Sequence, residues 1–166
     1  YDGATMGDFP SGNPWASDAF HCGLHDPIDP SWERLLTTPS TSGTSSIFLD
    51  RISNLRWSKG PSPSSRYWAN GYPGSFGALE YCENMNHGGI SNWRMPSQKE
   101  LLNAYEHGIQ DLSEDNTPTN NLGPLDSFHW ALTSPSSGTA VMVQLDEGLA
   151  NQNGRSSYST TICVAD

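Results

Sequence analysis

Oxygen-bearing side chains are concentrated in one stretch of the chain, residues 109–127. Their spacing is irregular and contains no EF-hand pattern. The side chains are Asp111, Glu114, Asp115, Asn116, Asn120, Asn121 and Asp126. Because Ca²⁺ takes about six to eight oxygen ligands from flexible loops, Asp111, Asp115 and Asp126 are candidate calcium ligands. The alternative is a solvated acidic loop in which the Asp and Asn side chains form turns.

A second candidate site is the aromatic segment Arg66–Tyr72. The apolar faces of sugar rings stack on exposed aromatic side chains, which makes Trp68 and Tyr72 candidate carbohydrate contacts. The other candidate ligand contacts are the amides Asn116, Asn120 and Asn121 of the polar stretch. The aromatic segment could equally be core that covers a sheet.

No residue pattern predicts catalysis. The five His residues are scattered and form neither an H-E-x-x-H motif nor a Cys/His zinc spacing. The cluster from His21 to His25 includes Cys22 and could bind a metal, but it lacks the second half of such a site. We therefore expect a protein that is not an enzyme, with no certain cofactor and Ca²⁺ as the one candidate.

The composition limits the possible partners. The chain has 166 residues and a formal net charge of −10, with 8 Lys and Arg against 18 Asp and Glu. This balance argues against nucleic acid and against anionic membrane surfaces, which both require clustered basic residues. No apolar run approaches the ~20 residues that span a bilayer, so we expect no membrane insertion. We expect an exported protein whose signal segment has already been removed.

Hydrophobic periodicity and helix-end signals predict an α+β domain with helices segregated from an antiparallel sheet. Ser97 and Glu100 form an S-x-x-E capping box, which starts a helix over 98–107. Another helix is predicted over 76–86, with Ser75 as its N-cap. Residues 29–36 are predicted to form a short helix, followed by a low-complexity connector over 37–46. The strands are predicted at 47–50, 54–58, 128–133, 139–145, 149–153 and 158–165.

Several segments together resemble one protein family. They are the stretch from Phe48 to Lys59, the pair Ala78–Cys82 and Gly89–Leu101 with its Trp-Arg-Met-Pro-Ser-x-x-Glu-Leu motif, His129–Ser134, and Ile162–Val164. In this order they resemble the C-terminal domain of the bacterial collagen-like adhesin Lcl and its relatives. The resemblance covers about residues 46–165, and it leaves residues 1–45 as a loop-rich extension or assembly segment before a domain at 46–166.

The resemblance implies a C-type-lectin-like fold, similar to the formylglycine-generating enzyme, with an antiparallel sheet, two helices and a long loop-rich region. It also implies a Cys82–Cys163 disulfide, which leaves Cys22 either free and buried or bridged to another subunit. It assigns structural roles to Trp57, Trp93, Arg94, Pro96, Glu100 and Trp130. Arg94 would then need a carboxylate partner, for which Glu100 and Asp50 are the candidates.

The function that the resemblance implies is extracellular adhesion at the cell surface, through a glycan or a surface protein. The ligand would lie along residues 109–134, because lectin-like folds present ligands from their long loop and adjacent strands. Sulfated glycans need basic residues to meet them, so at −10 neutral glycans, cation-bridged surfaces or a protein partner fit better. The alternative is a structural subunit or cap of an extracellular fibre that self-associates, for example as a trimer.

Overall fold

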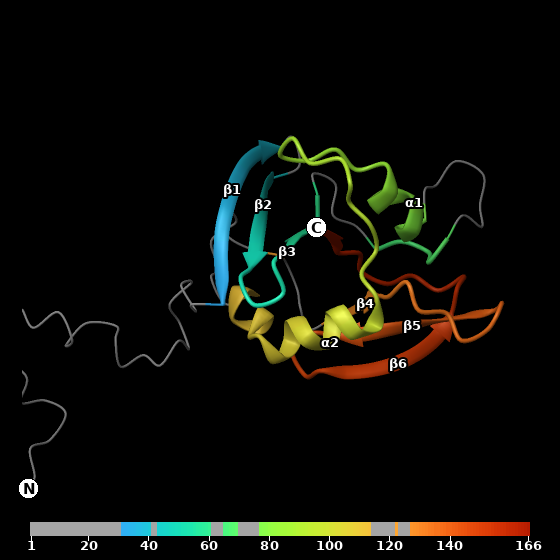
Figure 1. Cartoon of the computed structure of the whole chain (residues 1–166). Helices are drawn as coiled ribbons and strands as arrows, with labels where there is room; N and C mark the ends of the chain where they lie inside the picture. Colours follow the sequence, from blue (N-terminus) through green and yellow to red (C-terminus); the bar gives the residue numbers. More distant parts are fainter. Residues whose placement is uncertain (1–30, 41–42, 61–64, 70–76, 114–121, 123–126) are drawn as a thin grey trace, which may run out of the picture.

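The computed structural model describes residues 31–40, 43–60, 65–69, 77–113, 122 and 127–166 (Figure 1). These residues form a small α+β domain with two antiparallel sheets and two α-helices. One sheet has the strand order β1-β2-β3-β7, and the other has the order β4-β5-β6. The strands are β1 (Trp32–Ser40), β2 (Gly43–Asp50), β3 (Leu55–Ser58), β4 (Phe128–Trp130), β5 (Thr139–Gln144), β6 (Leu149–Gly154) and β7 (Cys163–Ala165).

The predicted short helix over 29–36 and the connector over 37–46 are wrong where the structure describes them. Residues 32–40 form β1, which pairs with β2 from Trp32↔Asp50 to Ser40↔Gly43. Pro30 and the following acid favour a helical first turn only locally, whereas the backbone hydrogen bonds to β2 come from residues up to 18 positions away. This hairpin crosses the boundary at residue 45 that the sequence suggested.

One of the two helices follows its local signals closely. α2 (Gln98–Glu106) starts at Ser97, whose side chain accepts the N–H of Glu100, while the Glu100 carboxylate accepts the N–H of Ser97. This confirms the predicted capping box. α1 (Ala78–Glu83) is shorter than predicted, and its N-cap is Gly77, which makes no side-chain cap hydrogen bond. The predicted cap, Ser75, lies outside the described residues.

Two hydrophobic clusters fill the domain, one on each face of β5. Val141, Val143 and Leu145 alternate along the predicted strand 139–145, as expected for residues on one face, and they pack with Leu101 and Ala104 of α2 in the first cluster. In Figure 1, α2 lies against β5. The second cluster contains the alternate residues of the strand with Trp130, Trp93 and the disulfide cysteines. Each face of β5 therefore has its own core.

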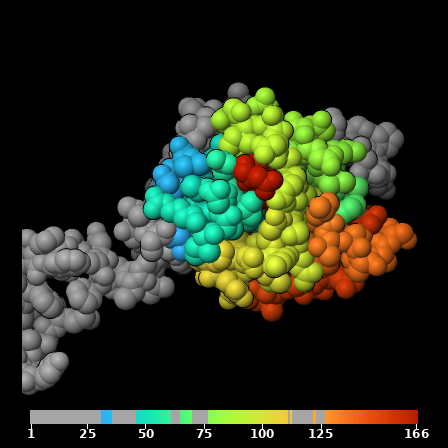
Figure 2. Space-filling model, in the orientation of Figure 1, coloured from blue at the N-terminus to red at the C-terminus, as the bar shows by residue number. Residues whose placement is uncertain are grey.

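The Cys82–Cys163 disulfide joins α1 to β7, with a Cα–Cα distance of 5.5 Å. The pairing implied by the resemblance is thus confirmed. β7 also pairs with β3 on one side and with Arg94 on the other, where Arg94 and Val164 exchange two backbone hydrogen bonds of 2.8 Å. Figure 2 shows the C-terminal residues, in red, at the surface between the teal β2–β3 residues and the yellow-green segment before α2.

Candidate functional site

A hollow of about 270 Å³ lies on the face of the β4-β5-β6 sheet opposite α2. Phe128 of β4 and Met142 of β5 supply its apolar part, and the remaining lining is polar. The lining residues are Ser65, Ser127, Phe128, Met142, Asn153, Tyr158, Ser159 and Thr160. None of these eight described residues is charged. We call this hollow and its lining the Tyr158 hollow.

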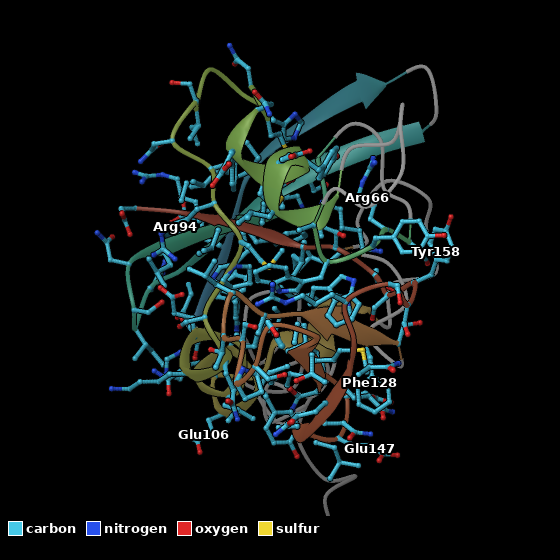
Figure 3. All side chains as sticks on the ribbon, turned by 90° about the vertical axis from the view of Figure 1, so that its right-hand side faces the viewer. Arg66, Arg94, Glu106, Phe128, Glu147 and Tyr158 are labelled. Atoms are coloured by element: carbon cyan, nitrogen blue, oxygen red, sulfur yellow. A yellow bond between two sulfur atoms is a disulfide. The ribbon has the colours of Figure 1, made fainter. Side chains whose placement is uncertain are left out.

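Tyr158 presents an aromatic ring at the edge of the hollow. Its side chain is 64% exposed, yet the ring lies against the ring of Tyr67, with centroids 4.1 Å apart. Arg66 and Ser159 exchange backbone hydrogen bonds of 2.8 and 3.0 Å, and these hold the two tyrosine-bearing segments side by side. Figure 3 labels Tyr158, Arg66 and Phe128 on the side of the molecule that faces the viewer. Tyr158 is therefore an exposed ring in a fixed position.

Hydrogen bonds fix the floor of the hollow. The hydroxyl of Ser159 donates to the carbonyl of Phe128, and the N–H of Thr160 donates to the same carbonyl at 3.0 Å. The backbone N–H of Trp130 donates to the carbonyl of Thr160 at 3.1 Å. The residues after Tyr158 are thereby joined to β4, so the lining is formed before any ligand arrives.

Asn153 supplies a polar group at the β6 side of the hollow. Its side-chain oxygen accepts hydrogen bonds from the N–H of Gly154 at 2.8 Å and from the hydroxyl of Ser157 at 3.1 Å. These contacts fix the orientation of the amide. Its NH₂ group donates to no other described residue, so it is free to donate to a ligand in the hollow.

Trp68, the first of the predicted sugar contacts, is a core residue. Its side chain is 8% exposed, and its indole N–H donates to the carbonyl of Ala131 at 2.7 Å. The guanidinium of Arg155 lies 4.3 Å from the centre of the indole and adds a cation–π contact. The sequence left two interpretations of the aromatic segment open, exposed sugar contacts or core. For Trp68 the structure supports core. Tyr72 lies outside the described residues.

The predicted calcium and amide ligands fall mostly outside the described residues. They include Asp115, Asn116, Asn120, Asn121 and Asp126. Asp111 belongs to the 3₁₀ helix η1 (Ile109–Ser113), and its side chain is not among those described. Within the described part of the chain, no three His, Cys, Asp or Glu side chains gather as a metal site.

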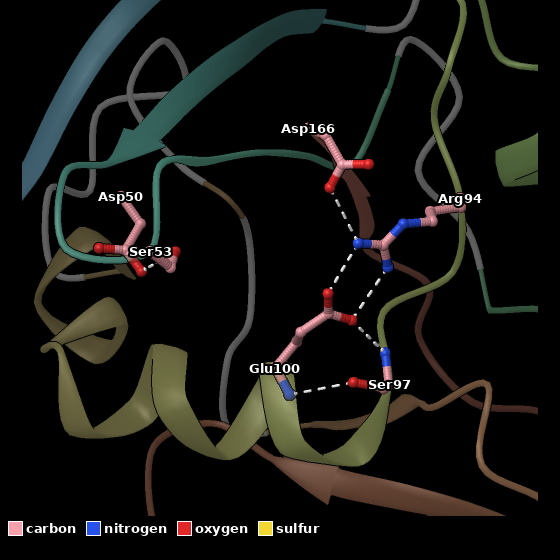
Figure 4. Close-up of polar contacts among 6 residues, drawn as sticks. All are labelled: Asp50, Ser53, Arg94, Ser97, Glu100 and Asp166. Carbon is pink, nitrogen blue, oxygen red and sulfur yellow. Dashed lines mark hydrogen bonds and ion pairs between the residues drawn. The ribbon is translucent and has the colours of Figure 1, made fainter.

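Arg94 forms an ion pair at the start of α2 (Figure 4). Its guanidinium donates to both carboxylate oxygens of Glu100, at 2.7 and 3.0 Å, and to Asp166 at 3.2 Å. The hydrogen bond with Glu100 raises the pKa of Arg94. Burial raises the pKa of Glu100, but the hydrogen bonds from Arg94 and Ser97 outweigh burial and hold that pKa below its usual value. Of the two carboxylates proposed from the sequence, Glu100 and not Asp50 pairs with Arg94.

Asp50 instead connects the β2–β3 turn to the end of α2. Its carboxylate accepts the hydroxyl of Ser53 and lies 2.7 Å from Nδ1 of His107. A serine nucleophile needs a histidine that accepts its proton, with the acid behind the histidine. Here Asp50 lies between Ser53 and His107, and it contacts both. The arrangement therefore fixes the turn and is not built to activate Ser53.

The other family residues occupy the core. Trp57, Trp93 and Trp130 are at most 2% exposed, and Pro96 accepts the N–H of Leu132 at 2.7 Å. Tyr158 was predicted to lie in a strand, and its exposed position was not predicted. The available signal was an aromatic residue alone in the polar run Ser156–Thr161, where it has no apolar neighbours to pack with.

Comparison with known proteins places the chain in one family. The model of the Lcl C-terminal domain family matches residues 46–165, more than half of the chain. No curated protein matches the sequence. Within the described residues, no helix is both long and apolar enough to cross a membrane. The family is associated with adhesins and suggests a protein exposed at the cell surface. The chain belongs to the Lcl C-terminal domain family.

Proposed function

We propose that this domain is a non-enzymatic recognition module of an extracellular adhesin, and that it binds a neutral glycan in the Tyr158 hollow. The observation that carries the proposal is the exposed Tyr158 ring, held against Tyr67 beside a lining of hydroxyl and amide groups. An aromatic ring offers the apolar face on which a pyranose stacks. The hydroxyls and the Asn153 amide supply the polar contacts that orient a ligand.

The charge of the lining determines the class of glycan. A sulfated or carboxylated sugar would need a cation to meet it, and the eight described lining residues supply none. The net charge of −10 would also repel an anionic polymer over longer distances. A neutral hexose or a neutral oligosaccharide fits both observations.

The resemblance to C-type-lectin-like folds supports the same location. In those folds the ligand is presented by the long loop and the strands beside it. Ser127 and Phe128, which line the hollow, lie at the end of the long polar segment that the sequence analysis singled out. Binding through the hollow is thus consistent with a lectin-like role for this domain.

A glycan array that contains neutral and sulfated probes tests the proposal, followed by titration of the best neutral ligand. Replacement of Tyr158 by Ala should weaken binding roughly tenfold, because a stacking contact can contribute about 1.4 kcal/mol. Tyr158→Phe retains the ring and should bind within about threefold of the parent chain. Ile52→Ala is the matched control, because Ile52 is similarly exposed, at 62%, in the β2–β3 turn.

Unchanged affinity in Tyr158→Ala, or binding of sulfated probes alone, would refute glycan recognition by this hollow. The alternative function, assembly into a fibre, has its own observation. β1 is the terminal strand of its sheet, and its bulge residue Leu35 is 42% exposed. Sedimentation of the same samples separates the two functions, since assembly predicts a defined oligomer and silence on the array.

A further inference from the structure

We propose that Asn153 is a site of spontaneous deamidation, in which the backbone nitrogen of Gly154 is the nucleophile. Asn153 and Gly154 are the last residues of β6, the outer strand of its sheet. Asn153 is exposed, and its side-chain oxygen lies 2.8 Å from the nitrogen of Gly154. The carbon that would be attacked is one bond from that oxygen, so the reacting atoms are already close.

The reaction needs only water. The Gly154 nitrogen loses its proton to solvent and attacks Cγ of Asn153, which forms a C–N bond and places negative charge on Oδ1. The intermediate collapses as the Asn153 nitrogen takes a proton from water and leaves as ammonia. A second water then opens the resulting succinimide at either carbonyl, which gives aspartate or isoaspartate. Overall, water is consumed and ammonia is released.

Ser157 favours the first step of this reaction. Its hydroxyl donates to Oδ1 of Asn153 at 3.1 Å, the atom on which negative charge develops. A donor that is already aimed at a developing oxyanion lowers the barrier, as in an oxyanion hole. The hydrogen bond from Gly154 thus holds the nucleophile close before it loses its proton, and the hydrogen bond from Ser157 stabilises the charge that the attack creates.

Asn151 provides an internal comparison on the same strand. Its side-chain oxygen also accepts the N–H of the following residue, Gln152, at 2.7 Å. The following residue there carries a side chain that crowds the nucleophile, whereas Gly154 has none. No hydroxyl among the described residues donates to the Asn151 oxygen. The two sites thus share the approach distance and differ in the two features that should accelerate the reaction.

The product would change the Tyr158 hollow. Asn153 lines it, so deamidation places a carboxylate in a lining whose described residues carry no charge. The isoaspartate product also adds one carbon to the backbone beside the pairs Ala140↔Asn153 and Thr139↔Gly154. Both changes should weaken binding of a neutral glycan as the protein ages. This consequence rests on the proposed function, whereas the modification itself does not.

Mass spectrometry of the aged full chain tests the proposal. After incubation at mildly alkaline pH, reduction and cleavage after Glu147 release residues 148–166, in which Asn151 and Asn153 are the two asparagines. Deamidation adds about 1 Da, because an NH₂ group is replaced by OH. We expect Asn153 to react at least roughly tenfold faster than Asn151. An isoaspartyl methyltransferase assay of the released peptide 148–166 should label it in proportion to its mass gain, and the peptide excludes the other Asn-Gly pair of the chain, Asn70-Gly71.

Gly154→Ala is the matched variant. Gly154 has no positive φ, and an added Cβ would lie 3.8 Å from the hydroxyl oxygens of Ser156 and Ser157, at ordinary contact distance. The variant should therefore fold normally and deamidate at least roughly tenfold more slowly. Ser157→Ala should slow the reaction as well. Equal rates at Asn151 and Asn153, or a rate unchanged in Gly154→Ala, would overturn the proposal. The mass readout needs no ligand, so it stands apart from any failure of glycan binding.

Discussion

His129 is the residue whose burial should make the stability of the domain depend on pH. It is fully buried, and burial together with the nearby Lys59 charge lowers its pKa to about 3. Burial outweighs the opposing effect of the backbone at Ser127 and Val143, and neither ring nitrogen has a hydrogen-bond partner among the described residues. The native state therefore holds His129 as a neutral imidazole.

The sign of the effect follows from proton linkage. The unfolded state protonates His129 below about pH 6.5 and the native state only near pH 3, so the unfolded state binds more protons between these values. The free energy of unfolding should fall as pH drops below 6.5, by about 2 kcal/mol at pH 5 from this group. Denaturant titrations of the parent chain and His129→Leu at pH 7 and 5 check this. The variant should lose about 2 kcal/mol less than the parent chain, and equal losses would mean that His129 is not the cause.

Arg94 should be more sensitive to replacement by Lys than other paired arginines. Its planar guanidinium meets both oxygens of Glu100 and also reaches Asp166, a geometry that a lysine ammonium cannot reproduce. The side chain is 36% exposed, so solvent screening limits the loss to about 1 kcal/mol. Arg51→Lys is the control, because Arg51 pairs with Glu33 where both side chains are exposed. In thermal unfolding, Arg94→Lys should lower the melting temperature more than Arg51→Lys does. Equal losses of melting temperature would contradict a special role for Arg94.

At the scale of elements, the disulfide fastens α1 to the last strand of the four-stranded sheet. It closes a loop between residues 81 positions apart, so it removes conformational entropy mainly from the unfolded chain. Replacement of both Cys82 and Cys163 by Ala should lower the free energy of unfolding by about 4 kcal/mol in the chain-entropy model. Denaturant unfolding with and without reductant measures this. The parent chain should lose stability when reduced, whereas the variant should not respond; a response of the variant would assign the effect to another thiol.

Some elements could be predicted from the sequence because their signals are local. The capping box at Ser97, the alternation of Val141 and Val143, and the turn at Gly148, where φ is +66°, all appear within a few residues. β1 could not be predicted in this way. Its segment begins with helix-favouring residues, and only the partner strand β2 reveals that an extended backbone is more favourable.

The candidate site was harder to predict than the fold. The Tyr158 hollow combines residues from Ser65, the start of β4, β5, β6 and the segment Tyr158–Thr160. No short motif contains them, and the position of Tyr158 depends on a ring contact with a residue 91 positions earlier, Tyr67. Trp68, the sugar contact that the sequence suggested, is covered by Arg155, which is also distant in the chain. Which aromatic ring is exposed is therefore a property of the tertiary structure.

At the scale of the whole molecule, two features of charge lead to opposite expectations for ligand binding. The chain carries a net charge of −10, so any partner recognised through long-range electrostatics should respond strongly to ionic strength. The described lining of the Tyr158 hollow carries no charged side chain. A ligand that stacks on Tyr158 and bonds to hydroxyl and amide groups makes contacts that salt does not screen.

Binding of a neutral glycan should therefore be nearly independent of salt. Between roughly 50 mM and 500 mM NaCl the Debye length falls about threefold, yet the dissociation constant should change by less than about twofold. Isothermal titration at several salt concentrations, repeated with Ca²⁺ and with a chelator, provides the measurement. A steep salt dependence would indicate contacts with charged groups elsewhere on the surface. Binding that disappears with the chelator would indicate that a bound cation contacts the ligand. The carboxylates of residues 111–126 would then be the candidate ligands of that cation.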